Sequence, residues 1–197
     1  MHTAVQQTSL TAFDGGLART LPDKIIFGIA ATLVVAAAAH ASVPLWFTPV
    51  PLSLQPFAVL IVGLTLGPVT GFFTMIAYLL EGAIGLPVFT PNGLGGIAQI
   101  AGPTGGYLMA YPFVAFVVGA MTRGLQAKLP RFASAAIACT AANALLFIGG
   151  AGWLMRFGNL SAHQVWIAAI APFLPGEAIM IVIAAGLYGS LSRFQRS

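Results

Sequence analysis

The chain has 197 residues, of which 58% are hydrophobic and 6% are charged, and its formal net charge is +4. Soluble domains carry about 25% charged residues, so this composition excludes a water-soluble globular protein. The basic residues are scattered at the ends of apolar runs, a distribution that indicates membrane topology rather than nucleic-acid binding.

Long apolar runs predict an all-α integral membrane protein with six transmembrane helices. A membrane-spanning helix needs about 20 mostly apolar residues, and proline and glycine mark the breaks between spans. The second span is short, which leaves open a tilted or re-entrant segment. No stretch shows the polar and apolar alternation of a β-barrel strand. The predicted spans are Pro22–Val43, Ser53–Leu66, Pro68–Leu86, Thr104–Leu125, Phe132–Leu154 and His163–Leu191.

The spans divide the chain into a cytoplasmic N-terminal tail, residues 1–21, a membrane domain, residues 22–191, and a C-terminal tail, residues 192–197. The first span also fits a signal peptide, with Lys24 as its basic flank and Ala39-His40-Ala41 as the cleavage site. The long preceding tail and the equally apolar remainder of the chain argue against that alternative.

Lysine and arginine in short loops predict the orientation, because they gather on the cytoplasmic side of a membrane. With six spans and both ends inside, Arg156 is the one basic residue on the outer side. Both termini are therefore expected in the cytoplasm. Three segments are expected on the outer face: Pro44–Leu52, Pro87–Pro103 and Met155–Ala162.

The third of the predicted breaks is rich in glycine, with six glycines between Asn92 and Gly106. A Walker A loop would continue with lysine, but Tyr107 follows Gly106 and the loop has no basic residue, which excludes nucleotide binding here. Two interpretations stay open. The glycines allow tight turns and close helix packing, which fits Gly105 and Gly106, or the segment with Asn92 and Gln99 lines a small-molecule pocket.

Three ionisable residues, His40, Glu81 and Glu177, lie at the outer ends of their predicted spans. Such residues are costly in a membrane and indicate functional sites, although solvation at the interface also explains His40 and Glu81. Glu177 follows Pro175-Gly176 and is predicted to accept hydrogen bonds from a ligand. The aromatic residues at this level form either an interfacial belt or a pocket wall; they are Trp46, Phe47, Trp153 and Trp166.

Catalytic and metal-binding motifs do not occur in the sequence, and no cofactor is expected. Cys139 is the only cysteine, which excludes a disulfide framework and a cysteine metal site. A membrane enzyme that uses Glu81, His40 and Glu177 is kept as an alternative function.

Three segments resemble the BioY family, the biotin-binding S components of energy-coupling-factor (ECF) vitamin transporters. They are Gly82–Pro112, which reads GAIGLPVFTPNGLGGIAQIAGPTGGYLMAYP, Thr48–Pro68 and Pro172–Met180. The resemblance extends from about Pro22 onward. It implies six helices with cytoplasmic ends, no catalysis, and capture of biotin at the outer face of a bacterial inner membrane. The implied partners are biotin, membrane lipid, a transmembrane coupling subunit and two separate ATPases; self-association and another vitamin as ligand stay open.

The resemblance also implies the binding residues. Asn92 and Glu177 would contact the ureido ring. Apolar walls would come from Trp46, Val50, Leu52 and Tyr107, and Gln55, Gly93 and Met180 complete the expected set. The family commonly has an aspartate at the position of Glu177, and a basic residue for the vitamin's carboxylate at the position of Met180. Here either Arg156 or a loop N–H takes the carboxylate, or a less charged relative of biotin is preferred.

The first span carries small residues at helical spacing, namely Gly28, Thr32 and Ala36, with Ala37 and Ala41 on a neighbouring stripe. Small residues allow helices to approach closely. The stripe indicates either packing within the protein or, by the resemblance, docking of the coupling subunit.

Overall fold

The computed structural model describes residues 20–194 of the chain, with side chains for residues 20–190. Of the predicted tails, residues 1–19 and 195–197 fall outside the described residues, and residues 192–194 continue the last helix. The described part is helical except for one small hairpin and the connecting loops. Its elements are α2 (Leu21–His40), β1 (Ser42–Val43), β2 (Leu52–Ser53), α3 (Gln55–Leu66), α4 (Pro68–Ala83), α5 (Gly96–Ala101), α6 (Gly105–Leu125), α7 (Arg131–Gly158), α8 (Ala162–Val165), the π-helix η1 (Trp166–Ile170) and α9 (Leu174–Phe194).

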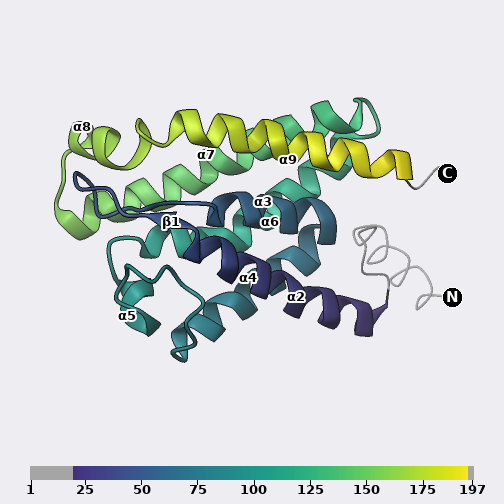
Figure 1. Cartoon of the computed structure of the whole chain (residues 1–197). Helices are drawn as coiled ribbons and strands as arrows, with labels where there is room; N and C mark the ends of the chain where they lie inside the picture. The colour runs from purple at the N-terminus through teal and green to yellow at the C-terminus, as the bar shows by residue number, and fades with distance from the viewer. Residues whose placement is uncertain (1–19, 195–197) are drawn as a thin grey trace, which may run out of the picture.

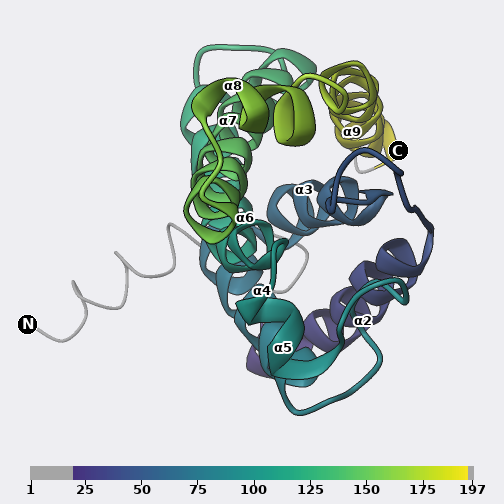
Figure 2. The ribbon, with the colours of Figure 1, turned by 90° about the vertical axis from the view of Figure 1, so that its left-hand side faces the viewer.

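The short helix α3 occupies the middle of an elongated bundle, with α2, α4, α6 and α9 around it (Figures 1 and 2). Its sequence is apolar on all sides, as expected of a helix that is covered all round. Gly67 alone joins α3 to α4, with φ at 87°, a backbone conformation that glycine adopts without strain. Pro68 then opens α4, where its missing N–H would have no partner in any case.

Each of the six predicted spans falls on a helix or, for the last span, on a helix pair. Within the described residues, α2, α6 and α7 are long and apolar enough to cross a membrane, and the pair α8–η1 with α9 makes a fourth candidate. Helices α3 and α4 have 12 and 16 residues, or about 18 and 24 Å, shorter than a hydrocarbon core of about 30 Å. The protein is therefore an α-helical membrane protein whose described helices differ in length, and three or four of them are long enough to cross a membrane.

The sixth span differs from the single continuous helix that was predicted. The segments Ala162–Ile170 and Leu174–Ser190 meet at an angle of 48°. Pro172 lies in the break and Pro175 in the first turn of α9, and neither can donate a backbone hydrogen bond to continue a helix. The break places Glu177 in the first turn of α9, where the helix dipole favours a negative charge.

Two of the predicted outer segments have structure of their own. The first is the turn of a hairpin in which Ser42 pairs with Ser53 and Val43 with Leu52. The second, the Gly-rich segment, contains the short helix α5, which was not predicted. Together with α8, these segments lie at the end of the bundle opposite the two termini (Figure 1).

The stripe of small residues on α2 faces α4 inside the protein. A Cβ atom at Gly28 would lie 3.3 Å from Thr74 Oγ1, and the Thr32 hydroxyl donates to Glu81 Oε1 at 3.1 Å. Ala37 and Ala41 on the neighbouring stripe are exposed. The first stripe therefore contacts α4 along the groove that Gly28 and Thr32 line, and docking of the coupling subunit stays a prediction.

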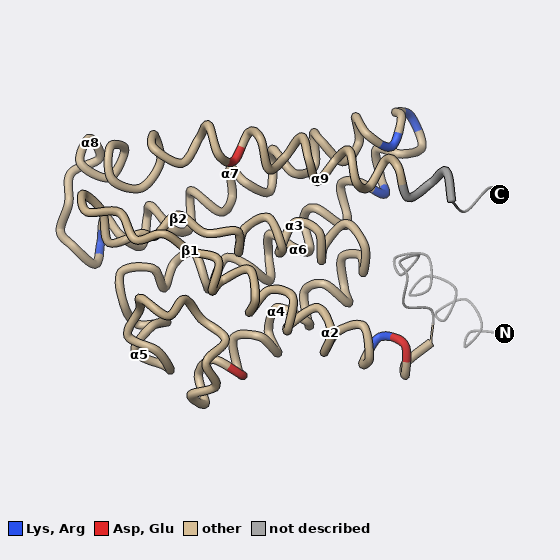
Figure 3. The backbone as a smooth tube through the Cα atoms, viewed as in Figure 1, with Lys and Arg blue, Asp and Glu red and all other residues tan. Residues whose placement is uncertain are grey.

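Basic residues gather at the end of the bundle where α2 begins and α9 ends (Figure 3). Lys24 lies in the first turn of α2, Arg123 in the last turn of α6, and Arg131 begins α7. Arg156, in the last turn of α7, lies at the opposite end. The charge separation expected from the sequence is thus present in three dimensions.

Candidate binding site

The site is a pair of adjoining cavities at the end of the bundle opposite the termini, beneath the hairpin and the Gly-rich segment. We name each by one residue that lines it. The Glu177 chamber has a volume of about 60 Å³ and the Asn92 chamber about 390 Å³. They share the four lining residues Pro51, Thr90, Gln99 and Thr104, so a single layer of side chains separates them.

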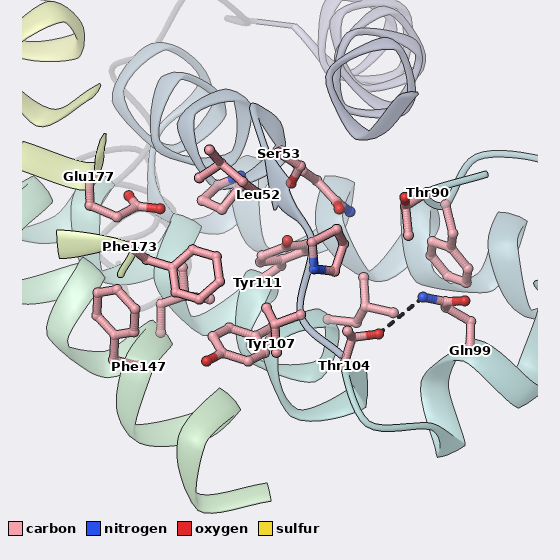
Figure 4. Close-up of a pocket in the computed structure, with 17 residues that line it drawn as sticks. Leu52, Ser53, Thr90, Gln99, Thr104, Tyr107, Tyr111, Phe147, Phe173 and Glu177 are labelled. Carbon is pink, nitrogen blue, oxygen red and sulfur yellow. Dashed lines mark hydrogen bonds between the residues drawn. The ribbon is translucent and has the colours of Figure 1, made fainter. Parts of the chain in front are cut away.

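The hairpin, the helices α3, α5, α6, α7 and α9, and the loops on either side of α5 build the Glu177 chamber (Figure 4). Its lining is mainly apolar and aromatic: Val50, Leu52, Pro56, Phe89, Tyr107, Leu108, Tyr111, Leu146, Phe147 and Phe173. Gln55, from the start of α3, adds an amide, and Glu177, from α9, adds a carboxylate. Glu177 is the only charged residue among those that line either chamber.

Glu177 is held from behind by a second polar residue. Its side chain is 6% exposed, and Oε2 accepts a hydrogen bond from Asn143 Nδ2 at 2.8 Å. Asn143, on α7, is 4% exposed and does not line the chamber. The pair leaves Glu177 Oε1 available to a donor inside the chamber.

The aromatic wall depends on the close approach of α6 and α7. Tyr107 donates its hydroxyl to Ala169 O in η1 at 2.8 Å. Its ring lies against Gly150, where a Cβ atom would overlap the ring. Trp153 lies against Gly106 in the same way, and its indole N–H donates to Gly102 O at 2.8 Å. Gly106, at the start of α6, therefore allows close packing against α7. This agrees with the interpretation that Gly105 and Gly106 serve helix packing.

A buried hydrogen-bond chain fixes the opposite wall. Gln55 Nε2 donates to the Tyr78 hydroxyl at 2.8 Å, and this hydroxyl donates to Val88 O at 2.7 Å. The chain links the start of α3 to α4 and to the segment that precedes the glycines. Gln55 is thereby held at the chamber with a defined amide orientation.

Gln99 closes the layer between the chambers. Its Nε2 donates to Thr104 Oγ1 at 3.0 Å, which is the dashed line in Figure 4, and its Oε1 accepts from Gly95 N at 3.2 Å. Glu177 lies at the far side of the chamber from this pair (Figure 4). Asn92 and Gly93 are exposed and line the other chamber.

The structure distributes the predicted binding residues over both chambers. Val50, Leu52, Gln55, Tyr107 and Glu177 line the Glu177 chamber, and Asn92 and Gly93 line the Asn92 chamber. Trp46 is 96% exposed on the hairpin turn and packs edge-on against Phe47. Trp46, Met180 and Arg156 line neither chamber. Asn92 and Glu177, expected on one ring of the ligand, are thus in different cavities.

Sequence reasoning missed Asn143, Tyr111, Phe147 and Phe173. One signal was available for Asn143, because it is the only amide in the uncharged run from Ala133 to Leu154, and polar residues inside a membrane are usually functional. The aromatic residues gave no such signal among so many apolar neighbours.

The other ionisable residues do not join Glu177. Glu81 lines a separate groove between α2 and α4, where it accepts the hydrogen bond from Thr32. His40 Nδ1 lies 2.9 Å from Ala36 O, in its own helix. Among the described residues, no group of three histidine, cysteine or acidic side chains could hold a metal ion.

Known proteins share both the sequence and the fold. The sequence profile of the BioY family matches residues 8–197. The chain is 34% identical over 166 residues to the probable biotin transporter BioY of Pyrococcus horikoshii, covering 82% of the chain and 95% of the relative. It is 32% identical over 168 residues to the biotin transporter BioY of Rhizobium etli, covering 83% and 89%. The crystal structure of the S-component for biotin from an ECF-type ABC transporter superimposes with a TM-score of 0.77 at 26% identity, covering 86% of this chain and 90% of that one.

Proposed function

The chain belongs to the BioY family, and from this premise we propose that it captures biotin as the S component of an ECF-type ABC transporter. It is a transporter subunit and not an enzyme. The energy for uptake comes from two ATPase subunits through a transmembrane coupling protein, all separate from this chain. The binding site lies toward the outer face of a bacterial cell membrane, and the basic end of the bundle lies in the cytoplasm.

The buried carboxylate of Glu177 in an apolar, aromatic chamber is the observation that carries the proposal. The ureido group of biotin has two N–H donors, and Glu177 Oε1 is an acceptor that its partner Asn143 does not use. Gln55 supplies an amide for the ureido carbonyl. The thiophene ring and the valeryl chain are apolar and suit the aromatic walls.

The ligand is larger than the Glu177 chamber, since binding pockets for small molecules measure about 300–1,000 Å³ and this chamber about 60 Å³. We therefore propose that the ring system occupies the Glu177 chamber while the acidic end extends into the Asn92 chamber. The like charge of Glu177 disfavours the opposite orientation. In this arrangement the layer formed by Gln99 and Thr104 opens on binding, and Asn92 meets the ureido ring only if its loop then moves inward.

Equilibrium binding of radiolabelled biotin to the detergent-purified protein tests the proposal. We expect nanomolar affinity for the unaltered chain. Glu177→Gln should weaken binding by roughly 10- to 100-fold, since a hydrogen bond to a charged group contributes about 1.5–3 kcal/mol.

Glu81→Gln is the matched control, because it neutralises a half-buried glutamate that lies in a separate groove outside the chamber, and it should bind biotin like the unaltered chain. If the unaltered chain does not bind biotin at micromolar concentration, biotin is not its ligand and the proposal is refuted. Unchanged binding by Glu177→Gln would refute the role of Glu177, and loss of binding in Glu81→Gln would show that the effect of removing an acid is not specific to the Glu177 chamber.

A further inference from the structure

We infer that Asn143 is a positioning residue: it orients the Glu177 carboxylate so that the site recognises an N–H group on the ligand. The inference deepens the proposed function and rests on it. No contact between Asn143 and the ligand is implied, because Asn143 does not line the chamber.

The hydrogen bond between the two residues is the first argument. A glutamate side chain has three rotatable bonds, and in an apolar chamber few groups can restrain its end. Asn143 Nδ2 at 2.8 Å from Oε2 is the one side-chain hydrogen bond found for this carboxylate. The backbone N–H of Glu177 donates to Phe173 O at 2.9 Å and fixes the start of the side chain. With both ends held, Oε1 is presented to the chamber in one direction.

The second argument is the place of Asn143 on α7. Asn143, Leu146 and Phe147 are three and four residues apart, so they share one face of the helix. Leu146 and Phe147 line the chamber, and Asn143, one turn earlier, lies behind Glu177. A single rigid helix therefore supplies both the wall that the ligand touches and the donor that orients its acceptor.

The third argument concerns the oxygen of the Asn143 side-chain amide. Asn143 Oδ1 is buried and has no hydrogen-bond partner. A buried acceptor without a partner lowers the stability of the fold, so an apolar residue of similar size would suit this place better if only packing mattered. The hydrogen bond from Nδ2 to Glu177 therefore explains why an amide occupies this position.

The experiment compares two ligands on each protein variant. One ligand is biotin, and the other is a cyclic carbamate analogue of biotin in which one ureido N–H is replaced by oxygen; both possible analogues are used. The unaltered chain should bind one of the two analogues more weakly than biotin by about tenfold or more, because that analogue loses a hydrogen bond to a charged acceptor. The ratio of dissociation constants, that of this analogue divided by that of biotin, measures how strongly the Glu177 carboxylate favours an N–H group on the ligand.

In Asn143→Leu, which keeps the size of the side chain, we expect the ratio to fall to about threefold or less, since an unrestrained carboxylate can turn away from the ligand. The thermal midpoint of the ligand-free protein is measured alongside, because the substitution removes the buried Asn143 Oδ1 that has no partner but also removes the hydrogen bond to Glu177 Oε2. Asn143→Ala should give the same collapse of the ratio if the leucine variant does not fold.

Leu146→Ala is the matched control from the same face of α7. It removes part of the chamber wall, so it should weaken biotin and the analogue equally and keep the ratio of the unaltered chain. Asn143 variants that behave like this control would overturn the inference, since their role would then be packing alone. If the unaltered chain binds biotin but does not distinguish it from either analogue, the inference fails while the proposed function stands; if it binds no biotin, the proposed function fails.

Discussion

Glu177 and Met180 lie one turn apart on α9, but only Glu177 lines a chamber. No lysine, arginine or histidine is among the residues that line either chamber. In the arrangement proposed above, the acidic end of biotin meets hydroxyl, amide and backbone groups in the Asn92 chamber. Met180 stands where the family commonly has a basic residue, which left Arg156, a loop N–H or a less charged ligand as alternatives. The lining of the chambers favours a site in which no cation pairs with the carboxylate of the ligand.

Biotin amide should consequently compete with radiolabelled biotin about as well as unlabelled biotin does, within roughly threefold, because no charge-assisted hydrogen bond is lost. Arg156→Ala should leave both affinities unchanged, since Arg156 is exposed and outside the chambers. An amide that competes more than about tenfold more weakly would contradict the prediction, and a parallel loss in Arg156→Ala would identify Arg156 as the carboxylate's partner.

For single residues, the kind of side chain in the candidate site was easier to predict from the sequence than the position of that side chain in space. An acid after a proline and a glycine in an apolar run marked Glu177 without any structure. Asn143 was missed because its partner is 34 residues away in the sequence. Trp46 was expected at a pocket wall, yet its position depends on the hairpin pairing of Ser42 with Ser53, which no local pattern specifies.

Among the elements, α6 and α7 form the pair on which the aromatic wall depends. Gly150→Ala would push a methyl group into the ring of Tyr107. Overpacking of this kind costs about 1–3 kcal/mol, so we expect a lower thermal midpoint. We also expect biotin binding to weaken by tenfold or more, in the range of about 1.4 kcal/mol, because Tyr107 lines the chamber.

Gly152→Ala, two residues along the same helix, tests whether the effect is specific. A Cβ atom there has no neighbour within 4 Å, and alanine favours a helix over glycine by about 1 kcal/mol. This variant should match or exceed the unaltered chain in thermal midpoint and should bind biotin normally. An equal loss of thermal midpoint and biotin binding in both variants would contradict the prediction, because the contact between Gly150 and Tyr107 would then not be what positions the aromatic wall.

The elements also show where sequence patterns reach their limit. Apolar runs and their Pro-Gly breaks located the long helices, because burial in lipid demands apolar length, and each of the six predicted spans falls on a helix or a helix pair. The bend in the last span was present in the sequence as Pro172 and Pro175 but was outweighed by the long apolar run. Helix α5 could not be predicted, since a helix of six residues that begins at Gly96, directly after Gly95, has little helical propensity and depends on tertiary contacts.

For the whole molecule, the separation of basic residues predicts a definite orientation. Cys139 is buried and should react slowly with a membrane-impermeant maleimide, so the native chain serves as a background. Ala162→Cys, at the start of α8, should be labelled in intact cells. Ala127→Cys, in the basic loop between α6 and α7, should be labelled only after permeabilisation.

Both positions are exposed alanines, so the two variants differ in location and not in chemistry. Labelling of Ala127→Cys in intact cells, with protection of Ala162→Cys, would reverse the assignment of the outer and cytoplasmic faces. Labelling of both in intact cells would contradict an odd number of membrane crossings between them.

The central place of α3 sets an order for biogenesis. Four of its neighbours, α4, α6, α7 and α9, follow it in the chain, and synthesis proceeds from the N-terminus. A nascent chain that ends after α6 has Gln55 and Tyr107 in place but still lacks Phe147 from α7 and Phe173 and Glu177 from the last span. If the chain binds biotin as proposed, the vitamin stabilises by mass action only molecules whose last helix has inserted.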